Sequence, residues 1–217
     1  TGAAPAGAPV YYHRAPMHPS DLADGPAQAT PTVPPGASLN LPGAQLRALA
    51  PADLPGLLAV QRACYGEDFV ESADVFTRRL ASPANCSLVL VQAGQVCAYL
   101  AAYHSVRGKV TPLHGDFEAT PHPDTLYLHD MAVLPALAGR GLARVLLQSL
   151  WQHANAQGLQ HAALVSVQGS QGYWERHGFA LCSPHGDAQR QHLASYGTAA
   201  VYMRKPLAAP AAATPLP

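Results

Sequence analysis

The sequence lacks any excess of charge: across 217 residues, 13 Lys and Arg balance 13 Asp and Glu. Without a positive field, counterion release does not draw the protein to nucleic acid or to an anionic membrane, so we expect neither as a partner. The chain also has no apolar run of about 18 residues, and no basic segment followed by an apolar core near its start. These absences predict a cytoplasmic protein that acts on small molecules or on local charged groups.

Cysteine is scarce, and its spacing forms no C-x-x-C pair; the four residues are Cys64, Cys86, Cys97 and Cys182. This spacing predicts neither a zinc site nor a disulfide framework, and it favours free thiols in a reducing compartment. The 11 histidines fall in no H-E-x-x-H motif or comparable cluster of ligands. We therefore expect no metal, and we expect most histidines at the surface or in loops.

Apolar periodicity is missing at both ends of the chain. Residues 1–43 are rich in Pro, Ala, Gly, Ser and Thr, as in PAQATPTVPPGAS, and this composition predicts a disordered arm. Residues 206–217 predict a flexible tail in the same way. The folded domain is therefore expected at 44–205. One hypothesis for the arm is that it recruits a partner through polyproline contacts.

Between these ends, helical and strand patterns alternate. A short strand in LRALA is followed by a predicted helix in LPGLLAVQRACYG with Asp53 as its N-cap, and ESADVFTRRLAS predicts a second helix. SLVLVQAGQVCAYLAAY predicts two antiparallel strands with a tight turn at Ala93 and Gly94. Further strands are expected at 125–133, 160–167, 179–183 and 199–207, and further helices at 141–157 and 170–178. The pattern indicates a mixed α/β fold.

The stretch AGRGLA joins the strand at 125–133 to the helix at 141–157. The first N–H groups of a helix lack internal acceptors and carry partial positive charge, so this turn suits an anion. Gly139 and Gly141 leave room for the amides to approach it, and Arg140 adds charge. A dinucleotide loop would need a third glycine where Arg144 stands, a Walker loop would need Gly-Lys-Ser/Thr, and a plain glycine-rich turn is the third interpretation.

VLPALAGRGLA resembles the acyl-CoA loop of the GNAT superfamily of N-acetyltransferases, whose pattern is V-x-P followed by Q/R-x-x-G-x-G/A. Val133, Pro135, Gly141 and Ala143 match the pattern, and Ala138 stands where Gln or Arg is usual. A second stretch, VQGSQGYWERHGF at 167–179, is similar to the later motif of the family, in which a strand splays from its neighbour before a short helix. At the position of the usual proton-donating tyrosine this chain has Trp174, which cannot give a proton to a thiolate.

The resemblance spans about residues 46–205. It implies the GNAT fold, a mostly antiparallel mixed sheet flanked by helices with one splayed strand pair. It also implies that acetyl-CoA is the cosubstrate, with its pyrophosphate at the glycine-rich turn and its pantetheine arm along the splayed strand. The predicted contacts with the cosubstrate are Met131, Val133, Ala138, Gly139, Arg140, Gly141, Leu142, Ala143, Gln168, Ser170, Tyr173 and Trp174. For Ser170, capping of the helix that follows is the favoured alternative.

Acetyl transfer to an amine needs a base and an acid. The resemblance implies that the strand at 125–133 passes beside the thioester, and strict alternation places His129 on one face with Tyr127, Met131 and Val133. His129 has the titration range that a base needs and is the candidate base, with a structural role as the alternative. Asp130 would point the other way unless a β-bulge turned it. Tyr196 is the candidate acid, with a buried structural tyrosine as the alternative. The acidic residues Glu67, Asp68 and Glu71 could hold a cationic amine or form a solvated turn.

The resulting prediction is an N-acetyltransferase that moves an acetyl group from acetyl-CoA to a primary amine of a small molecule or peptide by direct attack, as a monomer or homodimer. The alternative is a non-catalytic acyl-CoA-binding module or sensor with the same fold.

Overall fold

The computed structural model describes residues 41–65, 71–112, 115–167 and 169–207. Most of the predicted arm and tail therefore lies outside the described residues. The same is true of three residues of the predicted site region, Glu67, Asp68 and Gln168.

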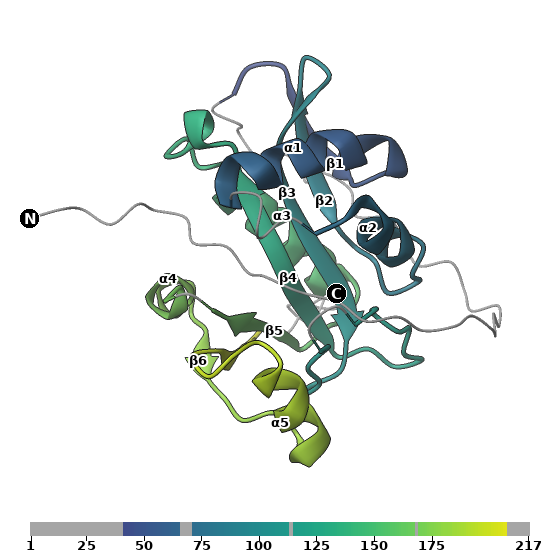
Figure 1. The fold of residues 1–217 in the computed structure, drawn as a ribbon, viewed down its shortest axis with the longest axis vertical. Coiled ribbons are helices and arrows are strands. Elements are labelled where there is room, and N and C mark those ends of the chain that lie inside the picture. Colours follow the sequence, from purple (N-terminus) through teal and green to yellow (C-terminus); the bar gives the residue numbers. More distant parts are fainter. Residues whose placement is uncertain (1–40, 66–70, 113–114, 168, 208–217) are drawn as a thin grey trace, which may run out of the picture.

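The chain folds around a seven-stranded sheet with the order β1-β2-β3-β4-β5-β7-β6 (Figure 1). β4 and β5 pair in parallel, joined by the α3 crossover, whereas the other neighbouring strands pair antiparallel. The predicted mixed and mostly antiparallel fold is thus confirmed. The strands are β1 Ala44–Ala48, β2 Leu88–Gln92, β3 Gln95–Ser105, β4 Thr125–Val133, β5 His161–Ser166, β6 Ala180–Leu181 and β7 Val201–Pro206.

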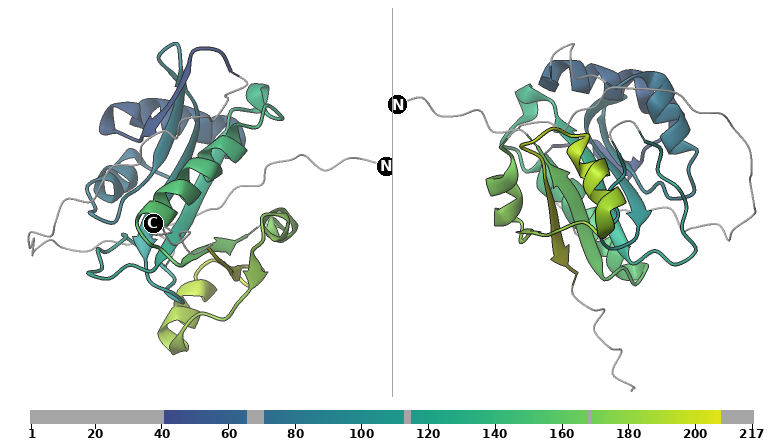
Figure 2. Two further views of the ribbon diagram at one scale, coloured as in Figure 1. Left: turned by 180° about the vertical axis from the view of Figure 1, so that it is seen from behind. Right: turned by 60° about the horizontal axis from the view of Figure 1, so that its bottom comes forward.

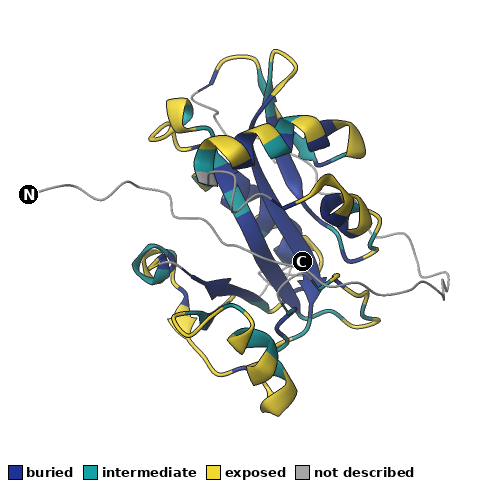
Figure 3. Cartoon of the chain, viewed as in Figure 1, coloured by how far each residue is buried: buried dark blue, intermediate teal, exposed yellow. Residues whose placement is uncertain are grey.

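Helices cover both faces of this sheet. Figure 1 shows α1 (Leu54–Tyr65) and α2 (Ala73–Leu80) on one face, and Figure 2 shows α3 (Leu142–Ala156) along the other. Each face has its own apolar core, and the strands between them are buried on both sides (Figure 3). The short α4 (Gln171–Arg176) and the helix α5 (Gly186–Ala194) lie beside β5 and β6.

Most predicted elements are present, and the differences have local causes. The hairpin turns at Ala93 and Gly94 as expected, with φ angles of 48° and 79°. Helix α5 was not predicted, because its segment carries no buried residue and therefore no apolar stripe. Asp53 does not cap α1 as expected; it ends a 3-10 turn, Pro51–Asp53, where its carboxylate pairs with Arg47 at 2.6 Å.

Strand β4 contains a β-bulge at His129. Asp130 pairs with Ala101 and Leu128 pairs with Ala102, so His129 is the extra residue in the ladder. The bulge turns both His129 and Asp130 toward α1 and α2, because each then contacts side chains of that face. The expected alternation, which placed Met131 and Val133 on the face of His129, is therefore wrong. Both pack against the core on the α3 side.

Within the described residues, no helix is both long and apolar enough to cross a membrane.

The close approach of α1 to β3 makes a prediction about Gly56. A Cβ atom at this position would lie 2.6 Å from Cγ2 and 2.9 Å from Cβ of Val96. We expect Gly56→Ala to lower the free energy of unfolding by about 1–3 kcal/mol, although alanine favours helix by about 1 kcal/mol. Urea unfolding followed by circular dichroism measures this. The control is Gly172→Ala in α4, whose nearest contact is 3.7 Å away; equal effects at both sites would contradict the packing argument.

Candidate active site

The glycine-rich turn begins α3. Gly141 is the N-cap residue with φ 78°, Gly139 has φ 77°, and the first intrahelical bond runs from the Val145 N–H to the Gly141 carbonyl at 3.1 Å. The amides of Leu142, Ala143 and Arg144 therefore precede the donors of the regular helix. Apart from the adjoining residues of the chain, no atom of the described residues lies within 4 Å of a Cβ built on Gly139 or Gly141. Glycine is required at 141 by its left-handed backbone rather than by lack of space.

A second feature is the separation of β4 from β5. The two strands pair from Thr125 to Leu128 and from His161 to Leu164, and their carboxyl ends then diverge, as Figure 1 shows. The Leu134 N–H bonds the Cys97 carbonyl at 2.9 Å. Because hydrogen-bonded pairs alternate in an antiparallel ladder, the N–H and C=O groups of Met131 and Val133 point away from β3, toward the side that β5 has left.

Cys64 of α1 lies at the carboxyl end of β4, where β4 and β5 have separated. Its thiol contacts the Val133 carbonyl at 3.1 Å, and burial raises the pKa of Cys64, with the nearby Asp130 charge raising it further. The thiol is thus protonated at neutral pH and donates to a strand carbonyl.

Helix α4 follows β5 on the other side of the divergence. Ser170 occupies its N-cap position but does not cap it, because its hydroxyl lies 2.8 Å from both the Val167 carbonyl and the Ser166 hydroxyl. The capping interpretation is therefore wrong. Trp174 is buried in the α3-side core against Phe179, with ring centroids 5.5 Å apart. Tyr173, by contrast, is half-buried.

Three buried side chains meet on the opposite face of the sheet. Arg79 of α2 contacts the carboxylate of Glu71 at 2.9 and 3.0 Å, and its Nη1 lies 2.7 Å from Nε2 of His129. A guanidinium only donates, so Nε2 of His129 accepts and the ring proton sits on Nδ1. Burial lowers the pKa of His129, and the Arg79 charge lowers it further. His129 is therefore a neutral ring at pH 7.

Glu71 is the counterion of this group. Burial is the largest single influence and raises its pKa, but the charge of Arg79 together with the contacts that His129 and Arg79 make with the carboxylate outweighs burial and holds the pKa of Glu71 at about 2. The solvated-turn interpretation is wrong for Glu71, which is 7% exposed. The sequence does not predict this pairing, because no local pattern links Glu71 to Arg79.

A second network adjoins the first. Oδ2 of Asp130 accepts from the Gln61 amide at 3.2 Å and from the Tyr99 hydroxyl at 2.5 Å, and Oε1 of Gln61 accepts from the Glu71 N–H at 3.0 Å. Gln61 thereby links Asp130 to the Glu71 segment, and the bulge in β4 places both networks on one face.

Tyr196 also lies on this face, at the core formed with α1 and α2. Its hydroxyl donates to the Thr111 carbonyl at 2.6 Å, and burial raises the pKa of Tyr196 well above its usual value. The structure therefore brings His129 and Tyr196 to the same side of the sheet.

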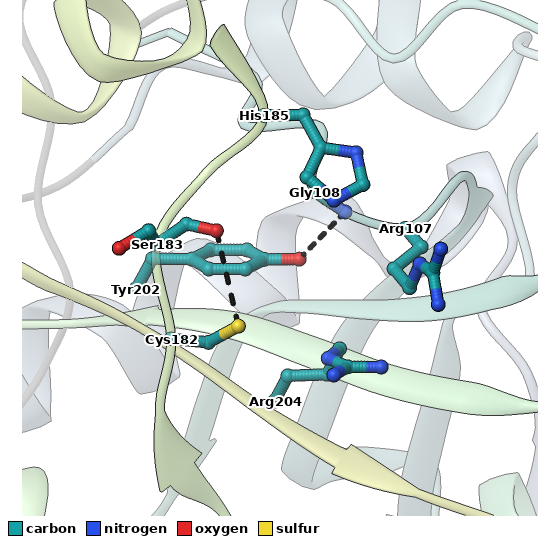
Figure 4. A pocket seen from close by; sticks show the side chains of 7 residues that line it. All are labelled: Arg107, Gly108, Cys182, Ser183, His185, Tyr202 and Arg204. Carbon is teal, nitrogen blue, oxygen red and sulfur yellow. Dashed lines mark hydrogen bonds between the residues drawn. The ribbon is translucent and has the colours of Figure 1, made fainter.

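A pocket of about 210 Å³ lies near β7 (Figure 4). It sits just beyond the end of β3, beside the N-terminal end of β4, whereas the glycine-rich turn follows the C-terminal end of that nine-residue strand. The Gly108 N–H donates to the Tyr202 hydroxyl at 3.2 Å, and two arginines lie beside the ring. None of the predicted site residues contributes to its lining, which is Arg107, Gly108, Cys182, Ser183, His185, Tyr202 and Arg204.

The glycine-rich turn and the diverging strands are the two features that the resemblance to the GNAT superfamily implied. The model of the acetyltransferase (GNAT) family matches residues 54–179, more than half of the chain. The chain belongs to this family. Its chemistry is therefore acyl transfer, and the family expected from the two sequence motifs is confirmed.

Solved structures show the same GNAT fold. The ribosomal-protein-S18-alanine N-acetyltransferase from Escherichia coli is 18% identical over 80% of this chain and 99% of its own, with a TM-score of 0.56. The GphF GNAT-like decarboxylase in complex with isobutyryl-CoA is 17% identical over 76% and 100%, with a TM-score of 0.56. The PaiA N-acetyltransferase from Thermoplasma acidophilum in complex with coenzyme A is 13% identical over 75% and 98%, with a TM-score of 0.52. No curated protein matches the chain.

The lowered pKa of Glu71 leads to a prediction about how the stability of the fold depends on pH. The carboxylate stabilises the fold fully above its unfolded pKa of about 4.3 and loses this contribution as pH falls toward 2. We expect Glu71→Gln to cost about 3–5 kcal/mol at pH 7, because it leaves Arg79 charged and uncompensated, and to cost progressively less below pH 4.5. Urea unfolding at pH 7, 4 and 3 measures this.

The neighbouring pair supplies the control. Arg78 and Asp116 lie 3.3 Å apart with side chains 48% and 53% exposed, so Asp116→Asn should cost less than about 1 kcal/mol at pH 7. A cost for Glu71→Gln that stays constant from pH 7 to pH 3 would refute the buried ion pair as its cause.

Proposed function

We propose that this protein transfers an acetyl group from acetyl-CoA to a primary amine of a small molecule or peptide by direct attack. The observation that carries the proposal is the divergence of β4 from β5 beside the glycine-rich turn of α3. The turn offers amides and partial positive charge to the pyrophosphate, and the exposed Arg140 adds a cation. The backbone groups of Met131 and Val133 bond the amides of the pantetheine arm, as in an added strand.

The remaining predicted contacts keep their roles in this proposal with one change. Ala138 and Gly139 precede the helix and complete the turn, and Tyr173 borders the pantetheine arm. Trp174 packs against Phe179 in the α3-side core, so in this proposal it anchors α4 rather than acting on the thiol. Gln168 lies outside the described residues.

The acceptor amine has to lose a proton before it attacks. A lysine-like amine has a pKa of about 10.4, so making it neutral near pH 7 costs about 4–5 kcal/mol. We propose that Asp130 accepts this proton, since the bulge turns its carboxylate to the face of His129 and Gln61 and Tyr99 hold it there. His129, the base expected from the sequence, is then a positioning residue, because its Nε2 lone pair already accepts from Arg79.

Tyr196 remains our candidate for returning a proton to the departing thiolate. Its raised pKa keeps it protonated at neutral pH, which an acid requires. Its hydroxyl has to leave the Thr111 carbonyl when it acts.

One observation favours a second function, a non-catalytic acyl-CoA-binding module or sensor. Trp174 stands where the family usually has a proton-donating tyrosine, and its side chain is buried in the core. Such a protein would bind acyl-CoA without turnover.

The function is tested by titrating the full chain with acetyl-CoA in a calorimeter and then measuring thiol release with a panel of amines, including peptides with free N-termini. Binding followed by thiol release and an acetylated amine supports the enzyme. Binding without release on any amine supports the sensor, and the absence of binding refutes both.

The turn itself is tested by Gly141→Ala. The left-handed φ of 78° costs alanine about 1–2 kcal/mol, so the turn deforms and we expect acetyl-CoA affinity to fall about tenfold. The matched control is Gly158→Ala at the other end of α3, where φ is 69° and the added Cβ also meets no atom within 4 Å. A change in affinity that is equal in the two variants would remove the turn from the binding site.

Substitutions of the two bulge residues, Asp130 and His129, should affect the rate of acetyl transfer differently. Asp130→Asn should lower kcat by about 100-fold or more with little change in acetyl-CoA affinity, because the proton acceptor is lost. His129→Gln should keep kcat/KM within about tenfold, because the Gln oxygen accepts from Arg79, and it should leave the pH profile unchanged. His129→Ala should lower kcat/KM further than His129→Gln does. If kcat/KM of His129→Gln fell by about 100-fold and the acid limb of its pH profile disappeared, His129 would be the base.

A further inference from the structure

Three potential metal ligands meet on the α3 face of the sheet. Cys86, His104 and His153 are 2%, 3% and 8% exposed, and one ligand atom from each lies within 4.8 Å of the other two. Cys86 lies two residues before β2, His104 lies near the end of β3, and His153 lies near the end of α3. None of them belongs to the proposed active site.

Backbone pairing holds the two strand residues in place. The Cys86 N–H bonds the Ala102 carbonyl at 2.9 Å, and the His104 N–H bonds the Ala84 carbonyl at 2.7 Å. Cys86 and His104 are therefore diagonal neighbours on one face of an antiparallel pair. Helix α3 runs along this face of the sheet (Figure 2). His153 is one of the buried residues of α3. The convergence is thus set by the sheet and by helix packing, not by flexible loops.

The distances suit a tetrahedral ion. With Zn–N bonds of about 2.0–2.1 Å and a Zn–S bond of about 2.3 Å, tetrahedral ligand atoms lie about 3.3–3.6 Å apart. The Nε2 atoms of His104 and His153 are 3.0 Å apart, so a small swivel of the rings opens room for the ion.

An orphaned hydroxyl lies next to this group. The Ser149 Oγ is buried and has no hydrogen-bond partner among the described residues. It precedes His153 by four residues and therefore shares its face of α3. A buried polar group without a partner indicates an unseen ion or water, and a water bound to the metal would satisfy it.

We propose that Cys86, His104 and His153 bind a structural Zn²⁺ ion, with a water as the fourth ligand beside Ser149. On binding, the Cys86 thiol loses its proton to solvent and its sulfur coordinates the ion as a thiolate. The ring that donated its Nε2 proton to the other becomes the Nδ1-H tautomer, so both imidazoles coordinate as neutral ligands. One proton is released per ion. Thiolate and imidazole ligands together select zinc over magnesium or calcium.

The position of the site assigns it a structural role. His153 is 11 residues beyond Leu142, so it lies about 16 Å along α3 from the glycine-rich turn. The ion joins the ends of β2 and β3 to α3, far from the groups proposed for acyl transfer. The sequence predicted no metal because the three ligands are separated by 17 and 48 residues, outside any compact ligand spacing.

The test uses the purified full chain. Its zinc content is measured by mass spectrometry after dialysis into chelator-treated buffer, and the metal-free protein is then titrated with Co²⁺ as a spectroscopic probe. We expect one zinc ion per chain and, with Co²⁺, a near-ultraviolet thiolate-to-cobalt charge-transfer band with tetrahedral visible bands. Cys86→Ala should abolish the charge-transfer band, and His153→Gln should weaken Zn²⁺ binding by about 100-fold. Cys182→Ser, at an exposed free cysteine, is the matched control and should change neither.

Stability gives a second readout that does not depend on activity. Zn²⁺ should raise the Tm of the wild type and of Cys182→Ser, but not that of Cys86→Ala, because the ion binds only the folded state. The proposal is overturned if the wild type binds no zinc, or if Co²⁺ binds without a charge-transfer band. It is equally overturned if Zn²⁺ raises the Tm of Cys86→Ala as much as that of the wild type. Zinc content and the Co²⁺ band are measured on the wild type, so the proposal can be tested even if a variant fails to fold.

Discussion

β4 and β5 hydrogen-bond to each other over four residue pairs and then separate. Beyond Leu128, strand β4 keeps β3 as a partner on one edge and loses β5 on the other, so a stretch of strand backbone is left with hydrogen-bonding groups directed into the opening. Helix α3 starts next to the same opening with its own amides exposed. Every part of the proposed cosubstrate site depends on this separation, because continued pairing would use the backbone groups that the pantetheine arm needs.

The β-bulge at His129 adds a second consequence at the same point of β4. One extra residue places His129 and Asp130 on one face, where strict alternation would have separated them. Each then joins a buried polar network, one with Arg79 and Glu71 and one with Gln61 and Tyr99. Burying a charge is costly unless it is paired and hydrogen-bonded, so these networks fix α1 and α2 relative to β4. The geometry of the sheet face that α1 and α2 cover therefore depends on polar contacts as much as on apolar packing.

The two faces of the sheet hold different functional groups. The α1 and α2 face holds the charged groups proposed for catalysis, whereas the α3 face holds an apolar core and, near the end of α3, the convergence of Cys86, His104 and His153. A buried group of polar side chains beside an apolar core requires a physical reason. A bound zinc ion provides one, because it satisfies the thiol, both rings and the neighbouring Ser149 together.

The sequence by itself determined the order of most elements, the hairpin at Ala93 and Gly94, the limits of β4 and the turn before α3, because these follow from local periodicity and from residues with special backbone freedom. It also determined the family, through two motifs built on such turns. Only the tertiary structure decided which side chains meet. The bulge that turns Asp130, the pairing of Arg79 with Glu71 and the meeting of Cys86 with His153 depend on strand register and on helix packing between distant segments. Those relations carry no local periodicity, which is why alternation and ligand spacing failed to predict them.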